Sequence, residues 1–276
     1  MNIHVKKTIP ITFDMVVKAY AKVKRGGKAV GIDNESWEIF EQKGIEKSLY
    51  VIWNRMASGS YFPQPVREVE ILKKDGRKRK LGIPTIRDRI AQQVIKMYME
   101  ERIDKRFHKS SYGYRPMKSS KQALQEVRQN CFKLDWIVDL DISNFFDEID
   151  HNLMMKAVKA ILPEKWVSMY IERWLEMKVV KPDGSIEERN GRGTPQGGVI
   201  SPILANLFLH YGLDKWLEIN FPQTHFVRYA DDVIVHCQTK EEAEGMLEAI
   251  QARLYEIGLR TNERKTKIVY CKDYRR

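Results

Sequence analysis

Cysteine is scarce in this sequence of 276 residues, which has only three: Cys131, Cys237 and Cys271. They lie far apart and in no spacing typical of a zinc site, which argues against a cysteine-based metal centre. Without a disulfide framework, the chain is expected in a reducing, cytoplasmic setting rather than outside the cell.

Long apolar runs are also missing. No stretch approaches the roughly 18 consecutive apolar residues of a membrane-spanning helix. Residues 1–14 have no apolar core long enough for a secretory signal peptide. Internal repeats and low-complexity tracts are absent from the sequence too. We therefore expect no membrane-spanning helix. The length suits one large domain or two closely packed subdomains.

Positive charge, by contrast, is abundant. The chain has 48 Lys and Arg against 37 Asp and Glu, a formal net charge of +11 and a pI near 9.4. This surplus favours a polyanionic partner, with nucleic acid first and a membrane surface second. Residues 73–80, KKDGRKRK, contain Asp-Gly and predict a basic hairpin turn. Such a hairpin is either a solvated turn or an element that closes over a triphosphate through Arg and Lys contacts.

Helical and strand patterns follow one another without regular alternation, which predicts an α+β fold. Asp150 and Ser201 are predicted N-caps, with Pro202 at the first helical position after Ser201. Helices are expected over residues 13–56 with a glycine break, 86–107, 121–130, 151–162, 203–219 and 240–258; strands are expected over 66–71, 136–146, 226–237 with a central turn, and 265–270.

Acidic residues interrupt two of the apolar strands. In FVRYADDVIVHC (residues 226–237) a tight turn carries two adjacent aspartates and no glycine. In WIVDLDISNFF (residues 136–146) alternation places Asp139 and Asp141 on one face. Each acid alone is explained by a solvated turn or a structural carboxylate. Side by side, three carboxylates would repel one another unless cations compensate them, and paired Mg²⁺ ions bridged by carboxylates serve phosphoryl displacement.

The loop GTPQGGVISP (residues 193–202) lies between these strands in the sequence. Its glycines allow close approach of backbone to a ligand, and Gln196 could orient a nucleotide. A loop that merely turns the chain explains the same pattern.

Three segments together resemble a known family. WIVDLDISNFFDEIDH, GTPQGGVISPILANLFLHYGLD and FVRYADDVIVHC are similar, in order and spacing, to the central motifs of bacterial group II intron reverse transcriptases, or maturases. VREVEILKKDGRKRKLGIPTIRDRIAQQ, SSYGYRPMKSSKQAL and GLRTNERKTKIVY extend the resemblance on both sides. It covers the chain from about residue 60 to about residue 270.

The resemblance implies a site. Its catalytic carboxylates are Asp141, Asp231 and Asp232, while Asp139 falls outside the family's catalytic position. Two Mg²⁺ ions are implied, held by these three carboxylates and the backbone carbonyl of Ile142. Phe146 matches the aromatic residue that collides with a ribose 2′-hydroxyl. The residues implied to contact the incoming nucleotide are Lys73, Arg79, Pro195 and Gln196, with Lys265 as a general acid for pyrophosphate; for Lys265 an ordinary surface lysine is the alternative.

The resemblance also implies a right-hand polymerase of fingers and palm, with an antiparallel palm sheet packed on helices and the thumb absent. The expected parts are an N-terminal extension and fingers (1–87), palm (88–149), fingers again (150–195) and palm again (196–276).

The implied activity is RNA-directed DNA polymerisation in the bacterial cytoplasm, from a DNA or RNA primer with dNTPs on an RNA template. Binding of group II intron RNA for splicing and mobility is implied as well, and no membrane partner is expected. Pairing as a homodimer stays open. Two alternatives remain: an RNA-binding splicing cofactor whose polymerase activity is dispensable, and a CRISPR-associated reverse transcriptase of related lineage.

Overall fold

A computed structural model describes residues 8–72, 76 and 78–271 of the chain. The chain divides into two compact units that interleave in sequence. Unit 1 comprises Met1–Glu101 and Lys159–Ser201, and unit 2 comprises Arg102–Val158 and Pro202–Arg276. Each unit mixes helices with a four-stranded sheet, which confirms the mixed class expected from the sequence.

Unit 1 combines a helical layer with a small sheet. Its helices are α1 (Phe13–Lys24), α2 (Trp37–Gln42), α3 (Ile45–Ser58), most of α4 (Ile86–Ile103) and α8 (Lys165–Leu175). The sheet has the order β2-β1-β4-β5, formed by β1 (Val66–Leu72), β2 (Lys78–Ile83), β4 (Val179–Val180) and β5 (Ile186–Glu187).

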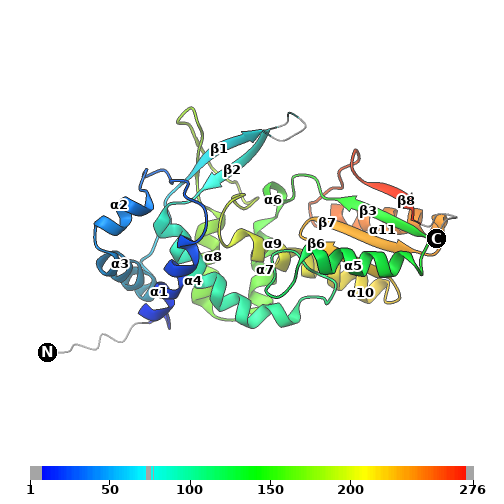
Figure 1. The fold of residues 1–276 in the computed structure, drawn as a ribbon, viewed down its shortest axis with the longest axis horizontal. Coiled ribbons are helices and arrows are strands. Elements are labelled where there is room, and N and C mark those ends of the chain that lie inside the picture. Colours follow the sequence, from blue (N-terminus) through cyan, green and yellow to red (C-terminus); the bar gives the residue numbers. More distant parts are fainter. Residues whose placement is uncertain (1–7, 73–75, 77, 272–276) are drawn as a thin grey trace. The chain divides into compact units, whose positions relative to one another are not determined.

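The predicted basic hairpin is present in unit 1. Strands β1 and β2 pair antiparallel from Arg67↔Ile83 to Leu72↔Lys78 (Figure 1). The tip of the hairpin, residues 73–75 and 77, lies outside the described residues. The turn type expected from Asp-Gly therefore stays a prediction.

The sheet of unit 2 is antiparallel throughout and has the order β6-β7-β3-β8. Its strands are β3 (Trp136–Asp141), β6 (His225–Tyr229), β7 (Asp232–Cys237) and β8 (Lys267–Tyr270). Along β3, Val138 and Leu140 are buried, whereas Asp139 and Asp141 are half-buried. The alternation read from the sequence is therefore confirmed, with both acids on the more open face.

Helices cover this sheet on both sides (Figure 1). Helix α5 (Ser120–Cys131) packs on β6, where Ala123 contacts Val227 and Tyr112. Helix α11 (Lys240–Glu256) packs on β3 and β7 from the other side. The remaining helical elements of unit 2 are η1 (Asp104–Arg106), α6 (Phe145–Glu148), most of α7 (His151–Ile161) and α9 (Ser201–Leu209), the π-helical turn η2 (His210–Asp214) and α10 (Lys215–Asn220).

Polar side chains cap the N-termini of several helices, as the sequence indicates. Asp150 accepts a hydrogen bond from the backbone N–H of Leu153 at 2.9 Å, which confirms it as the N-cap of α7. Thr239 similarly accepts from Glu242 at the start of α11. Ser201 is itself the first residue of α9 rather than its N-cap, so this helix begins one residue earlier than expected.

Two predicted elements extended too far. The strand expected over 136–146 ends at Asp141, because Asn144 adopts a left-handed conformation with φ of 45° and starts the short helix α6. The helix expected over 86–107 ends at Ile103 and continues only as the 3₁₀ turn η1. Apolar residues recur beyond both ends, at Ile142 and Phe145 after β3 and at Phe107 after α4, so the apolar pattern alone did not indicate either stop.

Candidate active site

Two of the three predicted catalytic acids face each other across the sheet of unit 2. Asp141 ends β3 and pairs with Asp232, which begins β7. Asp232 also pairs with Tyr229, the last residue of β6, and residues 230 and 231 form the connection between these strands. Directly opposed residues share one face of a sheet. The register therefore places Asp141 and Asp232 side by side, with Asp231 in the adjoining turn.

The charges of this cluster act on one another. Burial raises the pKa of the Asp232 carboxyl, although the residue as a whole keeps an exposed surface, and the nearby Asp231 and Asp141 charges raise it further. Lys265 opposes this rise. A carboxyl group is harder to ionise when other negative charges lie beside it. A cation bound among these carboxylates would relieve the repulsion, so the raised pKa is what we expect at a cation site.

The Asp141 carboxylate is bound by the loop that precedes β8. Lys265 Nζ lies 2.6 Å from Asp141 Oδ2, and Asn262 Nδ2 donates to Asp141 Oδ1 at 3.0 Å. The backbone N–H of Asn262 also donates to the Asp141 carbonyl at 2.8 Å. Sequence reasoning identified Lys265 and missed Asn262. The only signal for Asn262 was its position three residues before that lysine.

Ile142 and Phe146 follow the acid on the same segment. The Ile142 side chain is buried, and its backbone forms an isolated bridge with Thr261. Phe146 lies on α6 with 8% of its surface exposed and packs against Phe145 at a ring-centroid distance of 5.5 Å. The structure places both residues just after Asp141, and their roles stay predictions.

A second group of predicted residues lies within unit 1. Arg79 Nε, on β2, donates to Gln196 Oε1 at 3.0 Å, and the Gln196 carbonyl accepts from the N–H of Gly82 at 2.7 Å. A Cβ on Gly82 would come within 3.2 Å of Pro195, so the loop lies close against the strand. The basic hairpin and the glycine-rich loop are therefore joined. Lys73 lies outside the described residues.

Sequence reasoning missed the residue that holds this loop. Gln92, a buried residue on α4, accepts from the backbone N–H groups of Val199 and Ile200 at 2.8 and 3.3 Å. Gly197 has φ of 111°, and a Cβ there would lie 2.9 Å from the Gly82 carbonyl oxygen. Glycine is therefore required at position 197 both by its backbone conformation and by the close approach of β2.

The acids of unit 2 supply the oxygen donors that Mg²⁺ prefers. Within the described residues, however, no group of three or more His, Cys, Asp or Glu side chains is close enough to hold a metal ion as they stand. A lysine ammonium already neutralises Asp141. The carboxylate oxygens of the cluster suit a divalent cation, but the side chains would have to move closer together to coordinate one.

Across the part of the chain that the structure describes, no helix is long and apolar enough to cross a membrane.

The fold resembles that of a telomerase of known structure. Apo telomerase from Candida tropicalis, truncated from its C-terminal domain, superimposes with a TM-score of 0.56 at 14% sequence identity, over 75% of this chain and 50% of that one. At this identity the likeness shows the fold alone.

Sequence comparison shows the family. Residues 71–275 match the family described as reverse transcriptase (RNA-dependent DNA polymerase). The chain belongs to this family and carries the domain of an RNA-dependent DNA polymerase.

Two relatives match this chain over different shares of their own length. It is 31% identical to protein YkfC of Escherichia coli (strain K12) over 286 residues, which cover 90% of this chain and 74% of YkfC. It is 32% identical to the group II intron-encoded protein LtrA of Lactococcus lactis subsp. cremoris over 211 residues, which cover 74% of this chain. That match spans only 33% of LtrA.

Proposed function

We propose that this chain extends a primer with dNTPs on an RNA template, and that Asp141, Asp231 and Asp232 are its catalytic carboxylates. The observation that carries the proposal is the register of the unit 2 sheet, which pairs Asp141 with Asp232 beside the Asp231 turn. We assign the fingers to unit 1 and the palm to unit 2. The predicted boundaries after residues 87, 149 and 195 stay predictions.

Asp141, Asp231 and Asp232, with the Ile142 carbonyl, would hold the divalent metal that the family generally uses, which we take to be two Mg²⁺ ions. When bound, such ions lower the pKa of a primer 3′-hydroxyl and neutralise triphosphate charge. The chain's own contribution is to position these carboxylates. Lys265 stands beside Asp141 as the donor proposed to protonate the departing pyrophosphate.

The group in unit 1 is proposed to hold the incoming nucleotide. Arg79 offers planar guanidinium donors suited to phosphate oxygens, and its bond to Gln196 links the hairpin to the loop that includes Pro195. Lys73 is proposed for the same task. Phe146 in unit 2 is proposed to exclude a ribose 2′-hydroxyl.

The experiment that tests the proposal is primer extension on an RNA template, with and without Mg²⁺. Asp231→Asn and Asp141→Asn are each expected to slow extension by roughly 10³-fold or more, because each removes several kcal/mol of charge stabilisation. Binding of the template–primer should change little.

Asp139→Asn is the matched control. Asp139 lies on the same strand and face as Asp141, but it pairs with Lys267 at 3.8 Å and is 43% exposed. It is expected to keep extension near the wild-type rate. Wild-type rates in Asp231→Asn, or an equal loss in Asp139→Asn, would show that the carboxylates are assigned wrongly.

Binding of group II intron RNA, as a maturase in splicing and mobility, is a second candidate function. It is favoured by the similarity to LtrA, an intron-encoded protein, and by the net charge of +11. The test compares intron RNA binding in increasing salt with nucleotide incorporation by the same preparation. Binding without incorporation would favour a splicing cofactor. A bacterial, cytoplasmic location and a homodimer stay predictions.

A further inference from the structure

The turn that carries Asp231 adopts a conformation that its sequence does not favour. Residue Ala230 has φ of 57°, in the left-handed region that an alanine enters at a cost in free energy. Glycine would adopt this conformation freely. Neighbouring groups must therefore hold the backbone of Ala230 in place.

Arg228, two residues before Ala230, supplies one of these restraints. Its side chain is completely buried, and its Nη1 donates to the Ala230 carbonyl at 3.0 Å. That carbonyl belongs to the peptide group that joins Ala230 to Asp231. Because a peptide group is planar, fixing this oxygen also fixes the orientation of the Asp231 backbone nitrogen.

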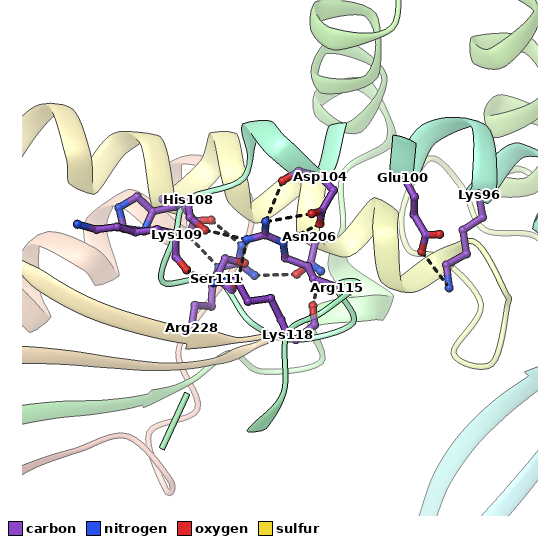
Figure 2. Close-up of polar contacts among 12 residues, drawn as sticks. Lys96, Glu100, Asp104, His108, Lys109, Ser111, Arg115, Lys118, Asn206 and Arg228 are labelled. Atoms are coloured by element: carbon purple, nitrogen blue, oxygen red, sulfur yellow. Dashed lines mark hydrogen bonds and ion pairs between the residues drawn. The ribbon is translucent and has the colours of Figure 1, made fainter. Parts of the chain in front are cut away.

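Two side chains hold the guanidinium itself. The Asp214 carboxylate accepts from Arg228 Nε at 2.7 Å and from Nη2 at 2.6 Å, so the pair is bidentate and fully buried. Asn206 Oδ1 accepts from Nη1 at 3.0 Å (Figure 2). The fork geometry of arginine allows all these bonds at once, which a lysine ammonium cannot reproduce.

The same network reaches the other side of the turn. Asn206 Nδ2 donates to the Gly113 carbonyl at 2.6 Å, and a Cβ on Gly113 would overlap the backbone nitrogen of Ala230. Backbone bonds from Tyr112 N to Arg228 O at 2.8 Å and from Arg228 N to Ser110 O at 2.9 Å hold this segment along β6. The Gly113 backbone therefore lies close against the Ala230 nitrogen, while Arg228 bonds the Ala230 carbonyl oxygen.

Packing alone does not account for a charged pair at this position. A buried ion pair contributes little net stability, because desolvation offsets the attraction between the charges. An apolar side chain would fill the space, but it would offer no donor to the Ala230 carbonyl. We propose that Arg228, held by Asp214 and Asn206, is a positioning residue that fixes the Ala230–Asp231 peptide and thereby the Asp231 carboxylate.

The catalytic consequence rests on the proposed function of Asp231, whereas the restraint of the turn does not. The test therefore has two readouts on the full chain. Hydrogen–deuterium exchange follows the segment 226–237, and primer extension separates kcat from KM for dNTP.

Arg228→Lys keeps a positive charge beside Asp214 and removes the fork. It is expected to speed exchange in the turn about tenfold, the factor expected from one lost hydrogen bond. It is also expected to lower kcat by roughly 10²-fold, the cost of a small misplacement. KM should change less than about threefold, because the nucleotide contacts proposed in unit 1 are untouched.

Arg253→Lys is the matched control in the same unit. Arg253 also donates to a backbone carbonyl, that of Gly212 at 2.8 Å, and to Glu256 at 2.9 Å, but it has no part in the turn. It should leave both readouts near wild type. If Arg228→Lys does not fold, Asn206→Ala replaces it, since this change removes both the Gly113 bond and one guanidinium partner while keeping the ion pair.

Wild-type exchange in the turn of the folded variant would overturn the proposal. Equal acceleration in β3 and α11 would overturn it as well, because it would indicate a general structural role. Faster turn exchange with unchanged kcat would overturn the catalytic part. If the wild-type chain shows no extension at all, the proposed function fails, and the exchange readout still decides whether Arg228 restrains the turn.

Discussion

We expect the buried Asp88 carboxyl to make the folding stability depend measurably on pH. The residue lies in the first turn of α4 and is completely buried. Its carboxylate accepts hydrogen bonds from the Tyr61 hydroxyl at 2.7 Å, the Thr85 hydroxyl at 2.7 Å and the Gln64 N–H at 3.1 Å. Burial nevertheless dominates and raises its pKa from 3.8 to about 6, with the hydrogen bonds opposing the rise.

Because its pKa is raised on folding, the Asp88 carboxyl makes the free energy of unfolding fall as the pH rises. The folded state binds the proton more tightly than the unfolded state, so this group stabilises the fold at low pH. That stability is lost as the pH rises from near 4 through 6. A shift of about two pKa units corresponds to roughly 3 kcal/mol in total. Roughly 1.5 kcal/mol of it falls between about pH 5 and pH 7.5.

Asp88→Asn removes the titration and keeps most of the contacts. An asparagine Oδ1 can accept from Thr85 and Gln64, and its amide can donate to the Tyr61 hydroxyl, which is able to accept. In urea unfolding at about pH 5 and pH 7.5, we expect the variant to gain roughly 1.5 kcal/mol relative to wild type at the higher pH. Comparing the two proteins cancels the titration of the histidines.

Asp14→Asn is the control for this experiment, because Asp14 is an exposed carboxylate on α1 whose side chain is 66% accessible and pairs with Lys18 on the same helix. The difference in free energy of unfolding between Asp14→Asn and wild type should be nearly constant over the same pH range. A constant difference for Asp88→Asn as well would refute the reasoning.

Two further predictions concern the acidic site. Phe146→Ala should reduce the preference for dNTP over rNTP by roughly tenfold or more, whereas Phe145→Leu, which changes the neighbouring buried ring, should not. An unchanged preference in single-nucleotide incorporation would show that Phe146 does not exclude the ribose 2′-hydroxyl. Lys265→Met should lower kcat roughly 10²-fold through loss of a general acid, while stability changes by less than about 1 kcal/mol because the lysine side chain is 49% exposed. Lys267→Met, which disrupts the more distant pair with Asp139, is its control, and equal rates for the two variants would contradict the assignment.

The elements closest to the acids could be predicted from local pattern. Alternation of apolar and acidic residues located β3 and its open face. Asp150 was predicted as the N-cap of α7, and its side chain accepts a hydrogen bond from Leu153 there. The end of β3 could not be predicted in this way. It depends on the left-handed conformation of Asn144, and nothing in the flanking apolar residues signals that conformation.

The sequence by itself determined the chemistry of this protein: its positive charge, its acids and the motifs that resemble reverse transcriptases. It could not separate Asp139 from Asp141 by alternation alone, because both occupy one face of the same strand. The family resemblance favoured Asp141, but only the tertiary structure shows that Asp141 meets Asp232, since the register of β3 against β7 is set by pairing between segments about ninety residues apart. The same is true of the restraint on Ala230, which comes from Gly113 and Arg228. Such contacts depend on how distant segments pack, and no local preference of an alanine predicts them.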